Sequence, residues 1–107
     1  MSTWTSEQIS GFIGEKVVDD HGHPVGTVTQ ISDRPGTLDP EWLVVKTSRF
    51  GHESLVPLEA VEETTAEDQV VHVPFNQSTV RSAPHPLSSL SLSDREREEL
   101  MSYYHQN

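Results

Sequence analysis

The apolar side chains of the first 75 residues are concentrated in short, mostly β-branched segments, which polar turns containing Gly or Pro separate. Each segment is shorter than the roughly ten residues that a helix usually needs, and Val is the commonest apolar residue in them. The segments comprise residues 17–18, 25–31, 42–45, 55–58 and 70–73. They predict an all-β domain of about five short strands. A closed or partly closed barrel is expected, because closure leaves no strand edge exposed.

A β-hairpin is the clearest local prediction. Residues 17–18 are followed by a polar turn that contains Gly22, and a second β-branched segment begins after the turn. Glycine readily adopts the positive φ angles that tight hairpin turns require. In the second segment Val28 and Ile31 are three residues apart, so strict alternation fails there. A β-bulge would return both side chains to one face of the sheet.

The next two segments differ in their expected burial. Residues 42–45 form a continuous apolar run, Trp-Leu-Val-Val, which is typical of a strand buried on both faces. We therefore expect this strand to be the most buried one. Residues 55–58 include Pro57, which has no N–H to donate to a ladder, so that strand is predicted at an edge or a bulge.

The distribution of apolar residues divides the chain into three parts. Beyond Phe75 only five Leu, Ile, Val or Phe residues occur, so the core is expected from the residues before it. We predict an N-terminal helical turn over residues 1–13 and a barrel over residues 14–75. Residues 76–107 are predicted to form a tail, extended over residues 76–89 by its prolines and serines, with a C-terminal helix.

Two capping boxes predict where the helices begin. In a capping box, a Ser or Thr and a Glu or Gln three residues later satisfy each other's free backbone N–H groups. Thr5 and Gln8 form one such pair before the N-terminal turn, and Ser93 and Glu96 form the other. A short helix is marginal in isolation, so we expect the C-terminal helix to dock on its own barrel or on another subunit.

The charge balance and the cysteine count exclude several classes of function. The chain carries 17 Asp and Glu against 7 Lys and Arg, a net charge of -10. Phosphate backbones and anionic lipids are bound through clustered Lys and Arg, so nucleic acid and membrane surfaces are not expected partners. The absence of Cys excludes disulfides and thiolate metal sites. No apolar run approaches the roughly 18 residues of a membrane span, and we predict a soluble, cytoplasmic protein without membrane insertion.

The order of these segments resembles that of the PRC-barrel domain. The opening contains a Gly, a short strand that ends in Asp19, a Gly turn and a Val-Gly pair that leads the second strand. Residues 42–45 are similar to the central strand of that domain, and residues 55–58 are similar to its Val-Pro-Leu segment before an acidic stretch. The resemblance covers residues 9–75. The tail, with its double tyrosine near the end, is similar to that of stand-alone bacterial members.

The resemblance implies a six-stranded β-barrel that binds another protein. The family includes the H subunit of purple-bacterial photosynthetic reaction centres and a ribosome maturation factor, in which the domain resembles a docking module. For this chain we expect a homodimeric interaction or scaffolding module with a protein partner in a larger assembly. The resemblance adds a bacterial source and a stress-related role. No cofactor is expected. The chain contains no Ser-His-Asp order, phosphate-binding Gly loop or HExxH motif, so we expect no enzyme and no catalytic residues.

The hairpin turn offers an alternative, a metal-binding or pH-sensing site. Asp19, His21 and His23 could hold a divalent ion, because carboxylates and imidazoles are common metal ligands. Histidine also titrates near neutral pH. However, a hairpin tip favours Asp and Gly without any ligand, and the His-x-His pair lacks a third and fourth ligand at a recognisable spacing. A plain turn is therefore the favoured interpretation.

Four aromatic residues are the candidates for partner binding: Phe50, Trp42, Tyr103 and Tyr104. Aromatic side chains bury a large area with few rotatable bonds and contribute strongly to protein interfaces. Phe50 is the first candidate, because an apolar ring in a predicted turn has little local function. Trp42 is expected in the core in preference to an interface. Tyr103 and Tyr104 would pin the tail either to the barrel or to a neighbouring subunit.

Overall fold

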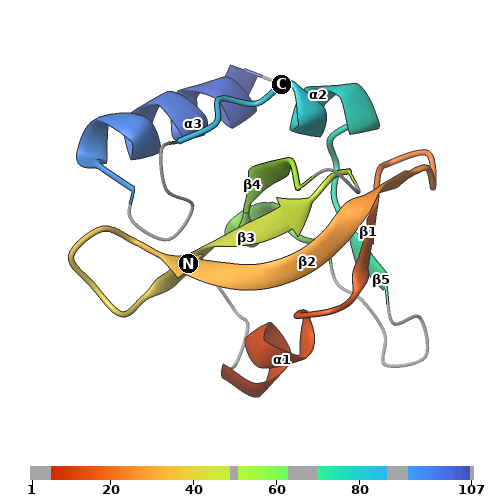
Figure 1. Cartoon of the computed structure of the whole chain (residues 1–107), viewed down its shortest axis with the longest axis horizontal. Coiled ribbons are helices and arrows are strands. Elements are labelled where there is room, and N and C mark those ends of the chain that lie inside the picture. Colours follow the sequence, from red (N-terminus) through yellow and green to blue (C-terminus); the bar gives the residue numbers. More distant parts are fainter. Residues whose placement is uncertain (1–5, 49–50, 63–69, 87–91, 107) are drawn as a thin grey trace.

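The computed structural model describes residues 6–48, 51–62, 70–86 and 92–106, with Ser6 described by its backbone alone. Five strands form one sheet in the order β4-β3-β2-β1-β5 (Figure 1). They are β1 (Lys16–Val18), β2 (Pro24–Asp33), β3 (Pro40–Lys46), β4 (Glu53–Pro57) and β5 (Val70–His72). Neighbouring strands run antiparallel, except that β5 pairs with β1 in parallel. Each apolar segment singled out in the sequence thus contributes a strand to one mixed sheet.

The sheet does not close, which corrects the prediction of a barrel with about six strands. β4 and β5 lie at the two ends of the strand order. An isolated bridge connects β5 to the segment that follows β4, and in it the Glu62 N–H donates to the His72 carbonyl at 2.8 Å. The fold therefore approaches a barrel at this bridge while its strand ladder remains open.

The pairing of β3 with β4 fixes which backbone groups of β4 face outward. At the end of this ladder the Thr47 N–H donates to the His52 carbonyl at 2.8 Å. Hydrogen-bonded and non-hydrogen-bonded pairs alternate along an antiparallel ladder, so Glu53 and Leu55 belong to non-hydrogen-bonded pairs. Their carbonyl groups consequently point away from β3, toward the open edge.

The tail of the chain provides partners for this edge. His85 Nδ1 lies 2.8 Å from the Glu53 carbonyl oxygen, and the Tyr104 hydroxyl donates to the Leu55 carbonyl at 2.6 Å. An exposed strand edge is a site for unwanted pairing with other chains. Side chains of the tail occupy the positions that a further strand would pair. This is the physical reason why β4 can stay at the edge.

Helices cover both faces of the sheet. They are α1 (Ser6–Gly11), the 3-10 helix η1 (Leu58–Ala60), α2 (Gln77–Arg81) and α3 (Asp94–Gln106). α2 and α3 lie on one side of the sheet and α1 lies on the other (Figure 1). The predicted N-terminal helical turn and C-terminal helix are therefore both present, while Thr5 of the first capping box lies outside the described residues.

α2 corrects the prediction of an extended segment over residues 76–89. Asn76 caps this helix, because its side-chain oxygen accepts the Thr79 N–H at 2.7 Å. The helix is one turn long and directs Val80 into the core. A single cap and one buried side chain are weak signals in a sequence rich in Ser and Pro.

The predicted hairpin is formed by β1 and β2. Gly22 in its turn has a φ of 80°, the left-handed conformation that favours glycine. The β2–β3 register shifts directly after Val28, where the sequence predicts a bulge. Beyond the shift Ile31 pairs with Leu43, two residues from the partner of Val28, so both side chains lie on one face. The bulge is confirmed.

The burial predictions for the central strands are confirmed. The four residues from Trp42 to Val45 in β3 have no exposed surface, which makes this run the most buried in the sheet. Pro57 ends β4, and β4 is an edge strand.

α3 begins with the predicted capping box. The Ser93 hydroxyl accepts the Glu96 N–H at 3.1 Å, and the Glu96 carboxylate accepts the Ser93 N–H at 3.0 Å. From this start the helix buries Leu100 and Tyr104 against the sheet. α3 thus docks on its own chain.

Candidate protein-binding groove

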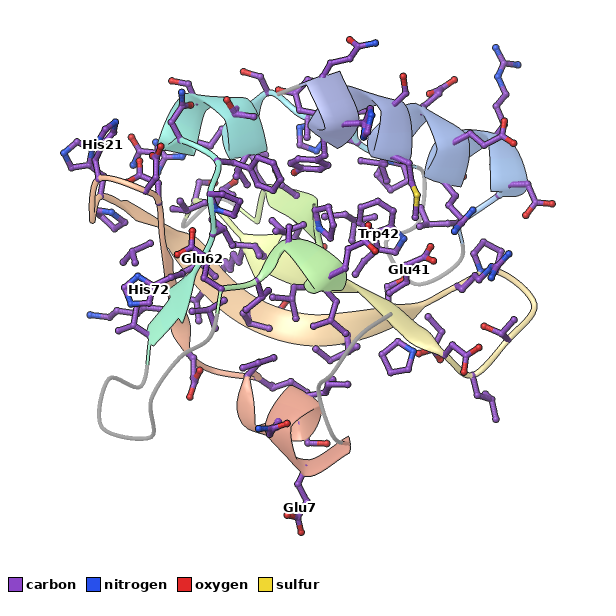
Figure 2. All side chains as sticks on the ribbon, turned by 180° about the vertical axis from the view of Figure 1, so that it is seen from behind. Glu7, His21, Glu41, Trp42, Glu62 and His72 are labelled. Carbon is purple, nitrogen blue, oxygen red and sulfur yellow. The ribbon has the colours of Figure 1, made fainter. Side chains whose placement is uncertain are left out.

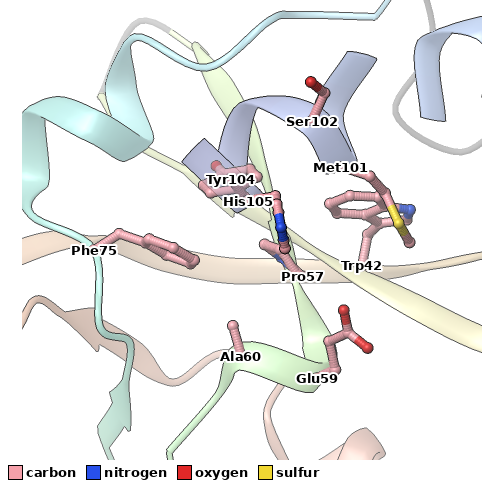
Figure 3. A pocket seen from close by; sticks show the side chains of 9 residues that line it. All are labelled: Trp42, Pro57, Glu59, Ala60, Phe75, Met101, Ser102, Tyr104 and His105. Atoms are coloured by element: carbon pink, nitrogen blue, oxygen red, sulfur yellow. The ribbon is translucent and has the colours of Figure 1, made fainter. Parts of the chain in front are cut away.

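A groove lies between the last turns of α3 and the end of β4 with η1 (Figure 3). Its volume is about 410 Å³, within the range of known small binding sites. The residues that line it are Trp42, Pro57, Glu59, Ala60, Phe75, Met101, Ser102, Tyr104 and His105. Because α3 provides one complete wall, the groove forms when the tail docks on the sheet.

Aromatic rings form the floor of the groove. The ring of Tyr104 lies 4.7 Å from that of Phe75 and 6.5 Å from that of Trp42, measured between centroids. All three residues are buried, and Trp42 has no exposed surface. Trp42 therefore supports the floor from beneath, which agrees with the core role that its strand predicts. A role of Trp42 in partner binding stays a prediction.

A shared carboxylate fixes the Trp42 indole and α3 together. Glu41 accepts two hydrogen bonds from the Arg97 guanidinium, at 2.5 Å from Nε and 2.9 Å from Nη2. The same carboxylate accepts the indole N–H of Trp42 at 3.0 Å. A paired guanidinium–carboxylate contact is stronger and more directional than a neutral hydrogen bond. This contact sets the position of α3 above β3.

The two neighbouring tyrosines attach α3 to its own chain. The Tyr104 hydroxyl donates to Leu55 in β4, and the Tyr103 hydroxyl donates to the Thr79 carbonyl in α2, both at 2.6 Å. Burial raises the pKa of Tyr104 above its ordinary value, and the neighbouring Tyr103 adds to this effect. Of the two alternatives that the sequence left open, the described contacts are those of a tail pinned to the barrel.

The rim of the groove is polar and exposed. Ser102 and His105 project from α3, and Glu59 projects from η1 on the opposite wall. Met101 and Ala60 are half-buried between the rim and the floor. Figure 3 shows Met101 beside Trp42, and Glu59 and Ala60 facing α3 across the opening. The groove thus combines an apolar interior with charged and polar margins.

Sequence reasoning missed most of this site. Met101 and His105 are four residues apart in a predicted helix, and a count of helix faces would have placed them together. No local signal puts η1 and Phe75 opposite them, because those segments meet α3 only in the folded sheet. Phe50, the first candidate from the sequence, lies outside the described residues, and its role stays a prediction.

Asp19 has a structural role in the hairpin turn. Its buried carboxylate accepts the backbone N–H groups of His21, His23 and Gln77 at 2.9, 2.8 and 3.1 Å. Burial alone would raise the pKa of Asp19, but these hydrogen bonds outweigh it and lower the pKa. Within the described part of the chain, no group of three or more side chains is arranged to hold a metal ion. The geometry of Asp19 is that of a plain turn.

A second apolar surface lies on the α1 side of the sheet. A shallow depression of about 440 Å³ there is lined by Ile9, Ser10, Ile13, Gln30, Ile31, Asp33 and Pro40. Ile13, which lines this depression, is 50% exposed. Exposed apolar side chains grouped on one face are typical of interaction surfaces. Both surfaces are therefore suited to protein contacts.

The open five-stranded sheet with its groove defines a small β-sheet domain. The model of the PRC-barrel domain matches residues 5–80 of the chain. The chain therefore belongs to the PRC-barrel family, as its sequence motifs predict. α3 lies beyond the matched residues, so one wall of the groove is built by a segment outside the family domain.

A solved structure supports the fold assignment. A Pseudomonas aeruginosa protein described as a 16S ribosomal RNA processing protein, RimM, is similar with a TM-score of 0.52 and 17% sequence identity. The similarity covers 73% of this chain and 47% of that protein, so this chain spans about half its length. Among curated proteins, none matches. No helix in the described segments is long and apolar enough to cross a membrane.

Proposed function

We propose that this PRC-barrel protein is a non-catalytic docking module whose protein partner binds in the groove between α3 and η1. The observation that carries the proposal is an opening of about 410 Å³ above a buried aromatic floor. Met101 at its margin supports this role, because a flexible thioether adapts to different apolar surfaces. The similar Pseudomonas protein is described as acting in ribosomal RNA processing, which supports a role within a larger assembly.

Affinity capture with a groove variant tests the proposal. Met101→Glu would place a charge in the apolar margin, while Met101→Leu keeps its size and polarity and serves as the matched control. We expect a defined set of proteins to co-purify with the wild type and Met101→Leu and to be lost with Met101→Glu. Circular dichroism should show that both variants are folded. If Met101→Glu captures the same proteins as the wild type, the groove is not the docking site.

A chelator in the same experiment tests the histidine alternative. Partners that bind in the groove do not depend on a metal ion, so they should survive the chelator. Partners lost on chelation and with a combined His21→Ala and His23→Ala variant would instead favour a metal-dependent protein.

We further propose that the protein acts as a homodimer through the α1 side of the sheet. The exposed Ile13 supports this, and Asp33 is the charged residue among those that line the depression there. Two copies with a net charge of -10 repel each other, so they meet most easily through a face with few carboxylates. The cytoplasmic location remains a prediction from the composition of the chain, and the stress-related role remains a prediction from the family resemblance.

Sedimentation measurements test the homodimer. The wild type should sediment as a dimer and Ile13→Lys as a monomer. Glu7→Gln is the control, because Glu7 points away from the sheet at the outer side of α1 (Figure 2). A monomeric wild type, or a dimer that Ile13→Lys leaves intact, would contradict this contact.

A further inference from the structure

We propose that the groove binds a basic segment of its partner, in which a large apolar side chain is flanked by Lys or Arg. This inference rests on the proposed docking function and adds the chemistry of the partner. It follows from two properties of the groove, its apolar interior and the sign of the charges along both margins.

The interior selects an apolar side chain. Pro57, Phe75 and Tyr104 are buried in the floor, and the Tyr104 hydroxyl is already engaged by the Leu55 carbonyl. The floor therefore offers ring surfaces with few free hydrogen-bonding groups. A partner gains by burying apolar surface there, and a polar side chain would lose its hydrogen bonds to water.

Carboxylates stand on both margins. Glu59 is exposed on the η1 side. On the α3 side, Glu98 precedes Ser102 by four residues, and Asp94 precedes Glu98 by four. Residues four apart lie on the same face of a helix, so Asp94 and Glu98 extend the groove margin that Ser102 begins. Both are exposed, so a row of carboxylates follows α3 beyond the residues that line the groove.

The described arginines near these carboxylates offset them only in part, because Arg97, which attracts Asp94 and Glu98, and Arg95 each have another carboxylate partner. Arg97, beside the floor, is already paired with Glu41, and Arg95 pairs with Glu99 at 3.3 Å. Among the described residues that line the groove, none is Lys or Arg. With a net charge of -10 for the chain, the field at the groove is negative. It attracts a basic segment and repels acidic peptides, nucleic acid and anionic membranes.

Fluorescence anisotropy with three labelled octapeptides tests this inference. The first is Lys-Arg-Ser-Leu-Leu-Ser-Arg-Lys, the second replaces both Leu by Ser, and the third replaces all four cations by Glu. We expect only the first to bind measurably, and its affinity to fall as salt rises from about 0.05 to about 0.5 M, because salt screens exposed charges.

Charge variants locate the binding. Glu59→Gln and Glu98→Gln should each weaken binding about 1.5- to 5-fold, as expected for an exposed ion pair. Glu7→Gln removes the same charge on the α1 side and should leave the affinity unchanged. Equal weakening by all three variants would show general charge attraction and overturn the site. Equal binding of the second peptide, in which Ser replaces both Leu, or failure of the first peptide to bind, would overturn the inference about the partner.

The two proposals fail in different ways. If Met101→Glu abolishes capture of a cellular partner but the basic peptide does not bind, the docking groove stands and the basic partner is refuted. If tighter binding is seen for the Glu peptide, the charge argument is wrong. If Met101→Glu changes neither cellular capture nor peptide binding, the groove itself is refuted.

Discussion

Replacing Tyr104 by Phe removes one hydroxyl from the interior and tests whether the tail covers the edge of β4. In the wild type this hydroxyl donates to the Leu55 carbonyl at 2.6 Å, at a position shielded from water. The variant loses that hydrogen bond and leaves a buried carbonyl without a donor. An unpaired buried acceptor costs about 1–3 kcal/mol, so we expect the free energy of unfolding to fall by that amount.

Urea unfolding followed by fluorescence measures the effect, and Tyr103→Phe is the matched control. Tyr103 makes a hydrogen bond of the same length to Thr79, but at a half-buried site where water can replace the lost donor. We expect Tyr103→Phe to cost about 0.5 kcal/mol. The slope of the unfolding free energy against urea concentration should be equal for both variants, because unfolding exposes the same surface in each. If Tyr104→Phe costs no more than Tyr103→Phe, the edge carbonyl does not depend on the tail.

The alkaline limb of the stability curve tests the burial of Tyr104 separately from its hydrogen bond. Burial raises the folded-state pKa of Tyr104 above the ordinary value of about 10, so the folded protein holds this proton more tightly than the unfolded chain. The stability from this residue is complete below about pH 10 and is lost as the pH rises toward the folded-state pKa. Tyr104→Phe should lack this loss. If the loss of stability at alkaline pH is the same in the variant, the pKa of Tyr104 is not raised in the folded protein.

Three further substitutions have definite expected outcomes. Gly26→Ala would drive a methyl group into the Lys46 backbone carbonyl, so thermal unfolding should show a loss of about 1–3 kcal/mol, and an unchanged melting temperature would refute the contact. Asp19→Asn weakens three hydrogen bonds to the carboxylate. Because the folded-state pKa of Asp19 is lowered, wild-type stability should fall as the pH drops below the ordinary Asp value, and the variant should lack that fall. Arg97→Met leaves the Glu41 carboxylate with the Trp42 indole alone and should cost about 1–3 kcal/mol by urea unfolding, whereas a neutral effect would show that the pair does not hold α3.

The strands could be predicted because their signals are local. The spacing of Val28 and Ile31 alone predicts the bulge. The pair Ser93 and Glu96 predicts the start of α3, because the two residues form reciprocal hydrogen bonds there. The Val25-Gly26 pair is one of the motifs that carry the family resemblance. The structure supplies its physical reason, since a side chain at Gly26 would collide with the neighbouring strand. In each case the determining contacts lie within a few residues or across one strand pair.

The groove and the open edge could not be predicted in the same way. Their contacts join residues far apart in the chain, such as Leu55 with Tyr104 and Glu41 with Arg97. A sequence pattern shows that a strand is apolar. It does not show which side chain from elsewhere in the chain will bond to the outward backbone groups of that strand. We expected barrel closure because a further strand is the general way to protect the exposed edge of a sheet. In this chain, side chains of the tail pair with the outward carbonyl groups of β4 instead.

The division between domain and tail has a consequence for specificity. The family match ends at residue 80, and two of the three rings of the groove floor, Trp42 and Phe75, lie within it. The exposed carboxylates Asp94 and Glu98 lie beyond it, on a helix held by contacts on its inner face. Changes on the outer face of α3 therefore alter the charge of the groove without disturbing the core. For the proposed partner, the family domain therefore supplies Trp42, Phe75 and Glu59, and the tail adds Tyr104 and the carboxylates of α3.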